Sequence, residues 1–317
     1  MHQEIVIKSI NLTKTYNGVS ALNNLNLLVK KHSIFGFLGP NGAGKTTTIK
    51  LLIGLIQPTS GSGEIFGYDI KNESIKIRAR IGYLPQEPAF YEHLSAREVL
   101  EFTARFFFSG PKRELNNRVS EILELVSLSD KADRSIKGYS TGEKRRLGIA
   151  QATINYPDLL ILDEPAASLD PIGRQDVLNI MSKLREHTTI FYSTHILDDV
   201  QKVSDTVGIL NKGQLIAQGS IKDILKSPGQ GTIFSVKVQG DTSKVYNQLV
   251  LQKWISNVNI TQLSDNGDYL LEITVSDDEY AQKNLFRELT KDSSLIISDF
   301  RRQEYELEDI FMKIIEG

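Results

Sequence analysis

Residues 39–47 have the residue types and spacing of a phosphate-binding loop, G-x-x-x-x-G-K-[ST]. They lie between an apolar, strand-like run at residues 34–38 and a stretch compatible with a helix at residues 46–53. In such a loop, glycines let backbone N–H groups approach phosphate oxygens, and the following helix N-terminus adds its positive dipole end. The lysine reaches the β- and γ-phosphates, and the next hydroxyl holds Mg²⁺. We therefore predict a site for a nucleoside triphosphate, built from Asn41, Gly42, Ala43, Gly44, Lys45, Thr46 and Thr47.

Two adjacent carboxylates, Asp163 and Glu164, follow the apolar run at residues 159–162. Ligands of parallel α/β sheets gather at the carboxyl ends of the strands, so we expect both acids near the phosphates. Because side chains alternate along a strand, neighbouring acids can take two roles. Asp163 would hold Mg²⁺ through its water shell, and Glu164 would orient and deprotonate the attacking water. The alternative is that Asp-Glu-Pro only ends a strand and begins a turn.

Two more polar residues follow strand-like segments, Gln86 after residues 81–84 and His195 after residues 188–193. Gln86 could bring an amide to Mg²⁺ and to the water. His195 would lie at the sheet edge where the phosphates are expected. A lone histidine is more often a surface or core residue, which is how we interpret the other four histidines of the chain. The residues by themselves leave both roles open.

The elements that must position these residues can be predicted from periodicity. Strand-like runs at residues 159–162, 189–193 and 207–210 alternate with helical segments, which indicates a mainly parallel α/β sheet. Two alternating stretches near the N-terminus are joined by Asn17-Gly18, a strong hairpin turn signal. Between about residues 96 and 128, apolar residues recur at three-to-four spacing, which predicts an inserted helical subdomain.

A second domain is predicted beyond the small, polar residues 227–231, which have the composition of a linker. The pattern βαββαβ then runs over residues 232–300 and suits a small ferredoxin-like or ACT-like α+β domain. A closing amphipathic helix is expected at residues 306–315. The predicted domains are thus residues 1–228, with the helical subdomain at about 87–155, and residues 232–317.

Composition limits the classes of function. The 317 residues hold 37 Lys and Arg against 39 Asp and Glu, a net charge of −2, so no basic field points to nucleic acid. The absence of cysteine rules out disulfide and thiol chemistry and fits a reducing compartment. No signal peptide is recognisable, and no apolar run approaches the roughly 20 residues that span a bilayer. We expect a soluble chain that would work at a membrane only through a partner.

Residues 139–152, YSTGEKRRLGIAQA, resemble the signature of ATP-binding-cassette (ABC) ATPases, usually written L-S-G-G-Q and followed by a basic helix. Ser140 is expected to cap a helix whose free N–H groups can meet an anion. The resemblance implies that Ser140 and Gly142 meet the γ-phosphate of ATP bound to a second subunit, so that catalysis needs a head-to-tail dimer. It also implies the fold of a P-loop cassette, with a RecA-like α/β core and antiparallel β and helical subdomains.

The other motifs of this family match in order over roughly residues 3 to 225. Tyr16 matches the aromatic residue that stacks on adenine, and Asp170 belongs to the D-loop motif. Gln86 matches the Q-loop glutamine and His195 the switch histidine. The catalytic residues implied by the resemblance are Glu164, His195, Gln86 and Lys45. The implied Mg²⁺ ligands are Thr46, Gln86 and Asp163.

The signature departs from the commonest form at two positions. Thr141 replaces a glycine and adds a side chain where close approach is needed. Glu143 replaces a glutamine and adds a negative charge near a triphosphate, which could weaken dimer closure through like-charge repulsion. Ser140 and Gly142 are retained, so we predict an active site.

The resemblance favours a transport subunit, because the chain has one cassette and no long coiled-coil insertion. It implies a second cassette subunit, either an identical copy or a paralogue, and a separate transmembrane permease, which would place the chain at the inner, cytoplasmic face of the cell membrane. Residues 301–311 resemble the ending of bacterial exporter ATPases that partner ABC-2-type permeases. Two alternatives stay open: an importer ATPase whose C-terminal domain senses a ligand, and a regulatory ABC ATPase without a permease.

Overall fold

The computed structural model describes residues 4–225, 232–263, 267–291, 295–303 and 311. It divides the chain into two compact units, residues 1–221 and 222–317, which are treated separately below. The predicted linker and the predicted helix at residues 306–315 lie outside the described residues, apart from Phe311, and so does most of the tail at residues 301–311. No helix in the described part of the chain is both long and apolar enough to cross a bilayer.

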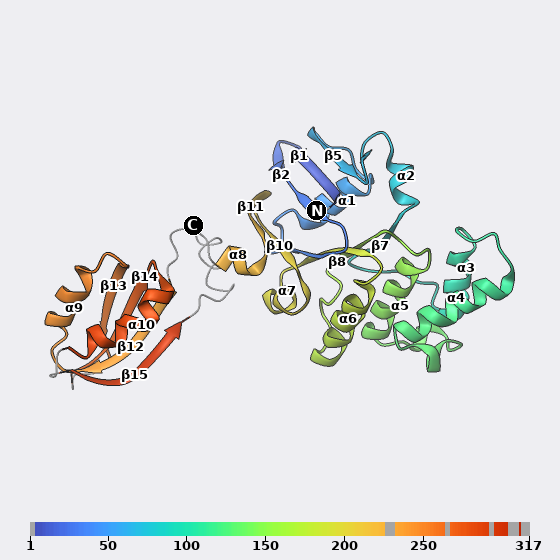
Figure 1. Cartoon of the computed structure of the whole chain (residues 1–317). Coiled ribbons are helices and arrows are strands. Elements are labelled where there is room, and N and C mark those ends of the chain that lie inside the picture. The colour runs from blue at the N-terminus through green and yellow to red at the C-terminus, as the bar shows by residue number, and fades with distance from the viewer. Residues whose placement is uncertain (1–3, 226–231, 264–266, 292–294, 304–310, 312–317) are drawn as a thin grey trace. The chain divides into compact units, whose positions relative to one another are not determined.

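The main sheet of the first unit has the strand order β11-β10-β4-β9-β8-β7 (Figure 1). Its strands are β4 (Ile34–Leu38), β7 (Ile81–Leu84), β8 (Leu159–Asp163), β9 (Thr189–Thr194), β10 (Thr206–Asn211) and β11 (Gln214–Gly219). All neighbours are parallel except β11, which runs antiparallel to β10. Every residue of β4, β8 and β9 is buried, as expected for strands covered on both faces. The mainly parallel α/β sheet predicted from the sequence is confirmed.

A second, antiparallel sheet comes from the N-terminal part of this unit. It contains β1 (Ile5–Tyr16), β2 (Val19–Leu25), β3 (Leu28–Lys30), β5 (Ser60–Ile65) and β6 (Tyr68–Asp69). Asn17 and Gly18 both have positive φ and form the predicted tight turn between β1 and β2. The alternating stretch predicted at residues 22–29 is divided between β2 and β3. One core cluster joins both sheets with α1 (Lys45–Leu52), which follows β4.

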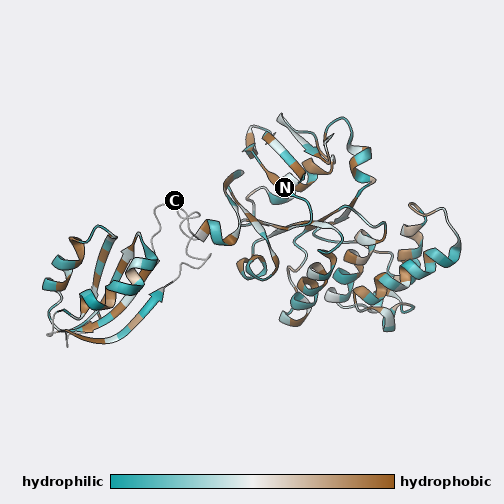
Figure 2. Ribbon diagram, viewed as in Figure 1, coloured by the Kyte–Doolittle hydropathy of each residue, from teal (hydrophilic) through white to brown (hydrophobic). Residues whose placement is uncertain are grey.

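Helices make up the rest of the first unit. They are α2 (Ser74–Arg78), α3 (Ala96–Ala104), α4 (Lys112–Leu125), α5 (Thr141–Thr153), α6 (Pro171–Leu184) and α7 (Leu197–Val203). A short helix, α8 (Ile221–Leu225), begins at the last residue of this unit. Figure 1 shows α3 and α4 beyond α5, at the opposite end of the unit from β11. Hydrophobic and hydrophilic residues lie side by side along α4 and α6 (Figure 2), so each helix buries one face.

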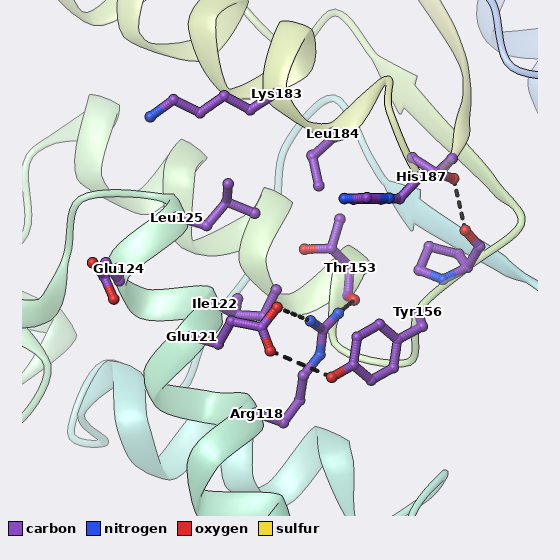
Figure 3. Close-up of a pocket in the computed structure, with 12 residues that line it drawn as sticks. Arg118, Glu121, Ile122, Glu124, Leu125, Thr153, Tyr156, Lys183, Leu184 and His187 are labelled. Carbon is purple, nitrogen blue, oxygen red and sulfur yellow. Dashed lines mark hydrogen bonds and ion pairs between the residues drawn. The ribbon is translucent and has the colours of Figure 1, made fainter.

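A cavity of about 710 Å³ lies between α4, the end of α5 and the end of α6 (Figure 3). The buried Arg118 of α4 spans it, donating hydrogen bonds to the carbonyl oxygens of Thr153 and Ile154 at 2.7 and 3.2 Å. Its guanidinium also lies 3.2 Å from the ring centroid of Tyr156 and pairs with Glu121 at 3.0 Å. A cation at the C-terminal end of α5 stabilises that helix, so Arg118 joins α4 to α5.

We expect Arg118→Ala to lower the free energy of unfolding by about 2–3 kcal/mol, because two buried carbonyl groups lose their donor and a cation–π contact is lost. Urea denaturation of the full chain measures this change. Lys76→Ala, which removes an exposed ion pair with Glu73, serves as the control and should cost less than about 0.5 kcal/mol. Equal stabilities of the two variants would refute the assigned role of Arg118.

The second unit has the element order β12 (Thr232–Gln239), α9 (Ser243–Val250), β13 (Ile255–Gln262), β14 (Asp268–Val275), α10 (Asp278–Leu289) and β15 (Ile296–Gln303). This is the βαββαβ order that the sequence predicts. Its sheet is antiparallel throughout, in the order β13-β14-β12-β15. Alternate residues of β12, starting at Phe234, are buried in one core with apolar residues of α9 and α10. The two helices therefore pack on the same face of the sheet.

Candidate active site

The phosphate-binding loop connects β4 to α1, as predicted. Gly42 and Gly44 have φ of 79° and 109°, a region that favours glycine. A Cβ at Gly44 would lie 2.6 Å from the carbonyl oxygen of Ala21, so the backbone approaches another strand too closely for a side chain. The loop opens into a cavity of about 310 Å³, lined by Ala21, Asn41, Gly42, Ala43, Gly44, Lys45, Thr46, Thr47, Gln86 and Glu164.

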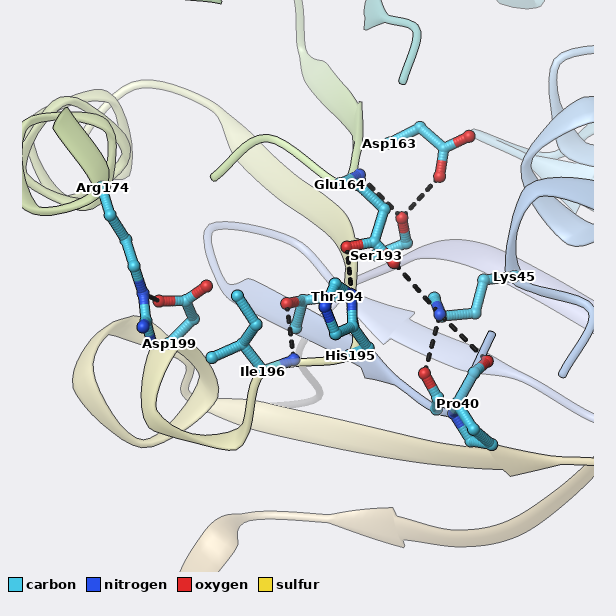
Figure 4. Close-up of polar contacts among 11 residues, drawn as sticks. Pro40, Lys45, Asp163, Glu164, Arg174, Ser193, Thr194, His195, Ile196 and Asp199 are labelled. Carbon is cyan, nitrogen blue, oxygen red and sulfur yellow. Dashed lines mark hydrogen bonds and ion pairs between the residues drawn. The ribbon is translucent and has the colours of Figure 1, made fainter. Parts of the chain in front are cut away.

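Lys45 is the buried cation of this cavity. Its ammonium donates to the carbonyl oxygens of Gly39 at 2.7 Å and Pro40 at 3.2 Å (Figure 4). The same Nζ lies 3.1 Å from Oε1 of Glu164, and both side chains are almost fully buried. The loop carbonyls and the carboxylate thus fix the charge of Lys45 at the cavity formed by this loop.

Glu164 lies one residue beyond β8 and has a positive φ of 51°, which is uncommon for a residue other than glycine. Its N–H donates to Oγ of Ser193 at 2.9 Å. Its Oε2 lies 2.9 Å from Nδ1 of His195, whose ring is about half exposed. The structure therefore brings Lys45, Glu164 and His195 together, with the carboxylate between the two nitrogen groups. This is an arrangement in which Glu164 can accept a proton from a nearby water.

Asp163 is the last residue of β8 and is fully buried. Its Oδ1 accepts a hydrogen bond of 2.6 Å from Oγ of Ser193. Its Oδ2 is buried and is the one such side-chain atom without a hydrogen-bond partner in the described part of the chain. A buried carboxylate oxygen that lacks a donor is suited to a hard cation or to the water that such a cation holds. The residues present therefore fit Mg²⁺.

Gln86 follows β7 and lines the cavity described above, together with Glu164. Its backbone carbonyl accepts a 2.7 Å hydrogen bond from the buried Arg145 of α5. Burial lowers the pKa of Arg145, and the charges of Glu164 and Asp163 oppose that shift. Arg145 thus connects the helix of the signature segment to the loop that carries Gln86.

Tyr16 ends β1, and its side chain is about half exposed. The ammonium of Lys14 lies 4.9 Å from its ring centroid. Tyr16 does not line the cavity of Lys45 and Glu164, so the structure does not bring it together with those residues. Its stacking on adenine stays a prediction.

Ser140, Gly142 and Asp170 line a different cavity, of about 440 Å³. Ser140 caps α5 as predicted, and its Oγ accepts from the N–H of Glu143 at 3.2 Å. Asp170 caps α6 by accepting from the N–H of Gly173 at 3.1 Å. The predicted nucleotide contacts of one chain are therefore divided between two cavities.

Two ion pairs link α6, which follows Asp170, to α7, which follows His195. Arg174, one turn after Asp170 on α6, pairs with Asp199 of α7, the helix that begins just after His195 (Figure 4). It also pairs with Asp198 of the same helix. Asp199 is buried, and this burial raises the pKa of its carboxyl against the opposing effect of Arg174. The contact ties the start of α6 to α7, and so to the segment that carries His195.

Comparison with known proteins decides the family. A family model described as ABC transporter matches residues 22–167. The ABC transporter ATP-binding protein YxlF of Bacillus subtilis is 36% identical over 307 residues, which cover 96% of this chain and 98% of YxlF. The chain belongs to the ABC transporter ATP-binding proteins. It is thus the ATP-binding and ATP-hydrolysing subunit of an ABC transporter.

Two further comparisons agree with this membership. The bacitracin transport ATP-binding protein BcrA of Bacillus licheniformis is 35% identical over 314 residues, covering 98% of each chain. The dimeric ABC ATPase MJ0796, solved in a post-hydrolysis state with ADP and Pi, has a TM-score of 0.62 and 27% identity. It covers 68% of this chain and 98% of its own. The cassette fold predicted from the resemblance is confirmed.

Ser193 has no role that the sequence predicts, although it lies two residues before His195. Its buried hydroxyl donates to Asp163 and accepts from the N–H of Glu164, so it holds both of the predicted acids. The only sequence signal is its place at the end of an apolar strand. That signal is weak, because a serine at this place can also simply end a strand.

We expect Ser193→Ala to lower the free energy of unfolding by about 2 kcal/mol, since two buried groups lose their partner. The rate of ATP hydrolysis should fall roughly tenfold, because the two acids lose their common anchor. Thermal unfolding and steady-state hydrolysis measure the two effects. Ser182→Ala, which removes a hydroxyl bonded to Leu178 within α6, is the control and should change neither by much. A normal rate in Ser193→Ala would contradict this assignment.

Proposed function

We propose that two cassettes bind two ATP molecules between them in a head-to-tail dimer. One observation carries the proposal: the residues predicted to contact ATP lie in two separate cavities of one chain. The phosphate-loop cavity would hold the nucleotide. The segment that contains Ser140 and Gly142, at the N-terminal end of α5, would cover the γ-phosphate from the second copy. Such a site is complete only when two chains meet.

Within this site Lys45 would neutralise charge on the transferred phosphoryl group, since its ammonium is held at the loop by two carbonyls. Glu164 would take the proton of the attacking water. His195, bonded to its Oε2, would hold the carboxylate in position. Gln86, which follows β7, would orient the attacking water. Tyr16 and Asp170 would complete the proposed contacts with the nucleotide.

Mg²⁺ would be held by Thr46, Gln86 and Asp163. The buried Oδ2 of Asp163, which lacks a hydrogen-bond partner among the described residues, supports this assignment. When bound, it supplies positive charge to the phosphate oxygens. The chain's own contribution is to fix Asp163 through Ser193, so that one carboxylate oxygen stays available.

We further propose that the chain powers export through a separate ABC-2-type permease at the cytoplasmic face of the membrane. The likeness to BcrA covers 98% of both chains and so includes the C-terminal region, beyond the cassette itself. Because BcrA is named for bacitracin transport, bacitracin is the first compound to test as cargo. The cassette would comprise residues 1–228, and residues 232–317 would form a ferredoxin-like accessory domain that supports dimerisation.

The experiment is a detergent pull-down of tagged Glu164→Gln from the native host with Mg-ATP, with Lys45→Ala as the control that should not respond to ATP. We expect a polytopic membrane protein in stoichiometric amount. Deletion of the gene that encodes the chain should then make the host more sensitive to at least one antibiotic of a panel that includes bacitracin. Recovery of only water-soluble partners, with unchanged sensitivity, would refute the exporter assignment.

A further inference from the structure

The unusual glutamate of the signature segment has two defined partners. Glu143 is the third residue of α5, and its Oε2 accepts a 2.7 Å hydrogen bond from the backbone N–H of Ser140. Together with the bond from its own N–H to Ser140 Oγ, this forms a reciprocal capping box. Its other oxygen, Oε1, lies 2.6 Å from Nζ of Lys131. The carboxylate is thus turned back onto its own helix end and paired with a cation.

Glu143 is ionised in this setting. Its side chain is only 11% exposed, and such burial by itself raises the pKa of a carboxyl. Donation from Lys131 and from the Ser140 N–H outweighs burial, so the pKa lies below its ordinary value. The like-charge repulsion expected from the sequence at this position is therefore offset within the chain.

Lys131 is itself held near the signature segment. It ends a short 3-10 helix, η1 (Ser129–Lys131), that follows α4. The hydroxyl of Tyr139, the residue just before Ser140, donates a 2.6 Å hydrogen bond to the backbone carbonyl of Lys131. Two contacts, one from the backbone and one from the ammonium, thus fix residue 131 to residues 139–143.

We propose that Lys131 is a positioning residue of the ATP-bound dimer, which keeps Glu143 as a neutral pair so that the side chain of Ser140 and the N–H group of Gly142 meet the nucleotide of the second copy without net negative charge beside them. This role rests on the proposed dimeric function. A glutamine at position 143 could make the same capping bonds without a charge and would need no such partner. Lys131 is then required only because position 143 is a glutamate.

A double-mutant cycle in the full-length Glu164→Gln background tests this dependence. The quantity measured is the ATP concentration at which half of the protein is dimeric, determined by analytical ultracentrifugation. Lys131→Ala should raise it about tenfold, because the carboxylate left without its cation repels the triphosphate. Glu143→Gln should change it less than about threefold, since the capping box survives. In the Lys131→Ala, Glu143→Gln double variant, the value should return to that of Glu143→Gln. Lys131→Arg should retain the parental value.

The outcomes separate the two levels of the proposal. Absence of an ATP-dependent dimer in the Glu164→Gln parent would overturn the proposed function and this role with it. Two other results would overturn only the role of Lys131. In the first, the parent forms the dimer and Lys131→Ala leaves the half-maximal ATP concentration unchanged. In the second, Lys131→Ala raises that concentration equally whether residue 143 is glutamate or glutamine. Lys76→Ala, which breaks a 2.8 Å lysine–glutamate pair on α2, is the matched control and should show the parental value. Full recovery in the double variant also shows that loss of folding does not explain the single variant.

Discussion

Glu164→Gln will lower ATP hydrolysis at least about a hundredfold and leave the chain as an ATP-bound dimer, because a general base contributes roughly 10²–10⁴ to the rate. The amide has nearly the same shape as the carboxylate but cannot take the proton of the attacking water. It also removes the negative charge that lies 3.1 Å from Lys45. The lysine then loses its anionic partner and keeps only the two loop carbonyls, which favours its interaction with the phosphates of bound ATP.

Steady-state phosphate release measures the first effect, and sedimentation with and without ATP measures the second. Glu186→Gln alters an exposed glutamate on the same unit and provides the matched control, which should keep the parental rate. Hydrolysis by Glu164→Gln at the parental rate would remove Glu164 from the role of base. A low rate without dimer formation would instead place its effect on folding or on binding.

Lys45→Ala will weaken ATP binding at least about a hundredfold, since the loss of a buried cation that meets a phosphate removes a charge-assisted interaction. It also removes the lysine partner of the buried Glu164, so that a carboxylate held only by His195 and no longer balanced by Lys45 faces the triphosphate. Both effects act in the same direction on affinity. Isothermal titration with ATP measures the dissociation constant directly.

Lys50→Ala is the control for this prediction, because Lys50 lies on the same helix but is exposed. Its affinity should stay within about twofold of the parent, as expected for a surface charge. Circular dichroism of both variants establishes that α1 and the sheet remain folded. Tight ATP binding by folded Lys45→Ala would contradict the placement of the phosphates at this loop.

The local parts of this protein could be predicted from the sequence. The phosphate-binding loop, the cap formed by Ser140 and the turn at Asn17-Gly18 each depend on residues that are neighbours in the chain. Periodicity determined the type of most elements, because burial of one or both faces imposes a spacing on apolar residues. Element ends differ by a few residues, and the stretch at residues 22–29 is divided between two strands. The resemblance to ABC ATPases supplied the roles that spacing could not.

Tertiary structure alone decided how these parts meet. Ser193 lies 30 residues from Asp163 in the chain, and only the pairing of β8 with β9 brings its hydroxyl to both acids. The ion pair of Lys131 and Glu143 could not be predicted from the sequence either. The sequence therefore suggested that Glu143 would repel the triphosphate. Periodicity records which face of an element is buried but not which element covers it. Strand order and helix packing therefore determined the contacts of the site and its division between two cavities.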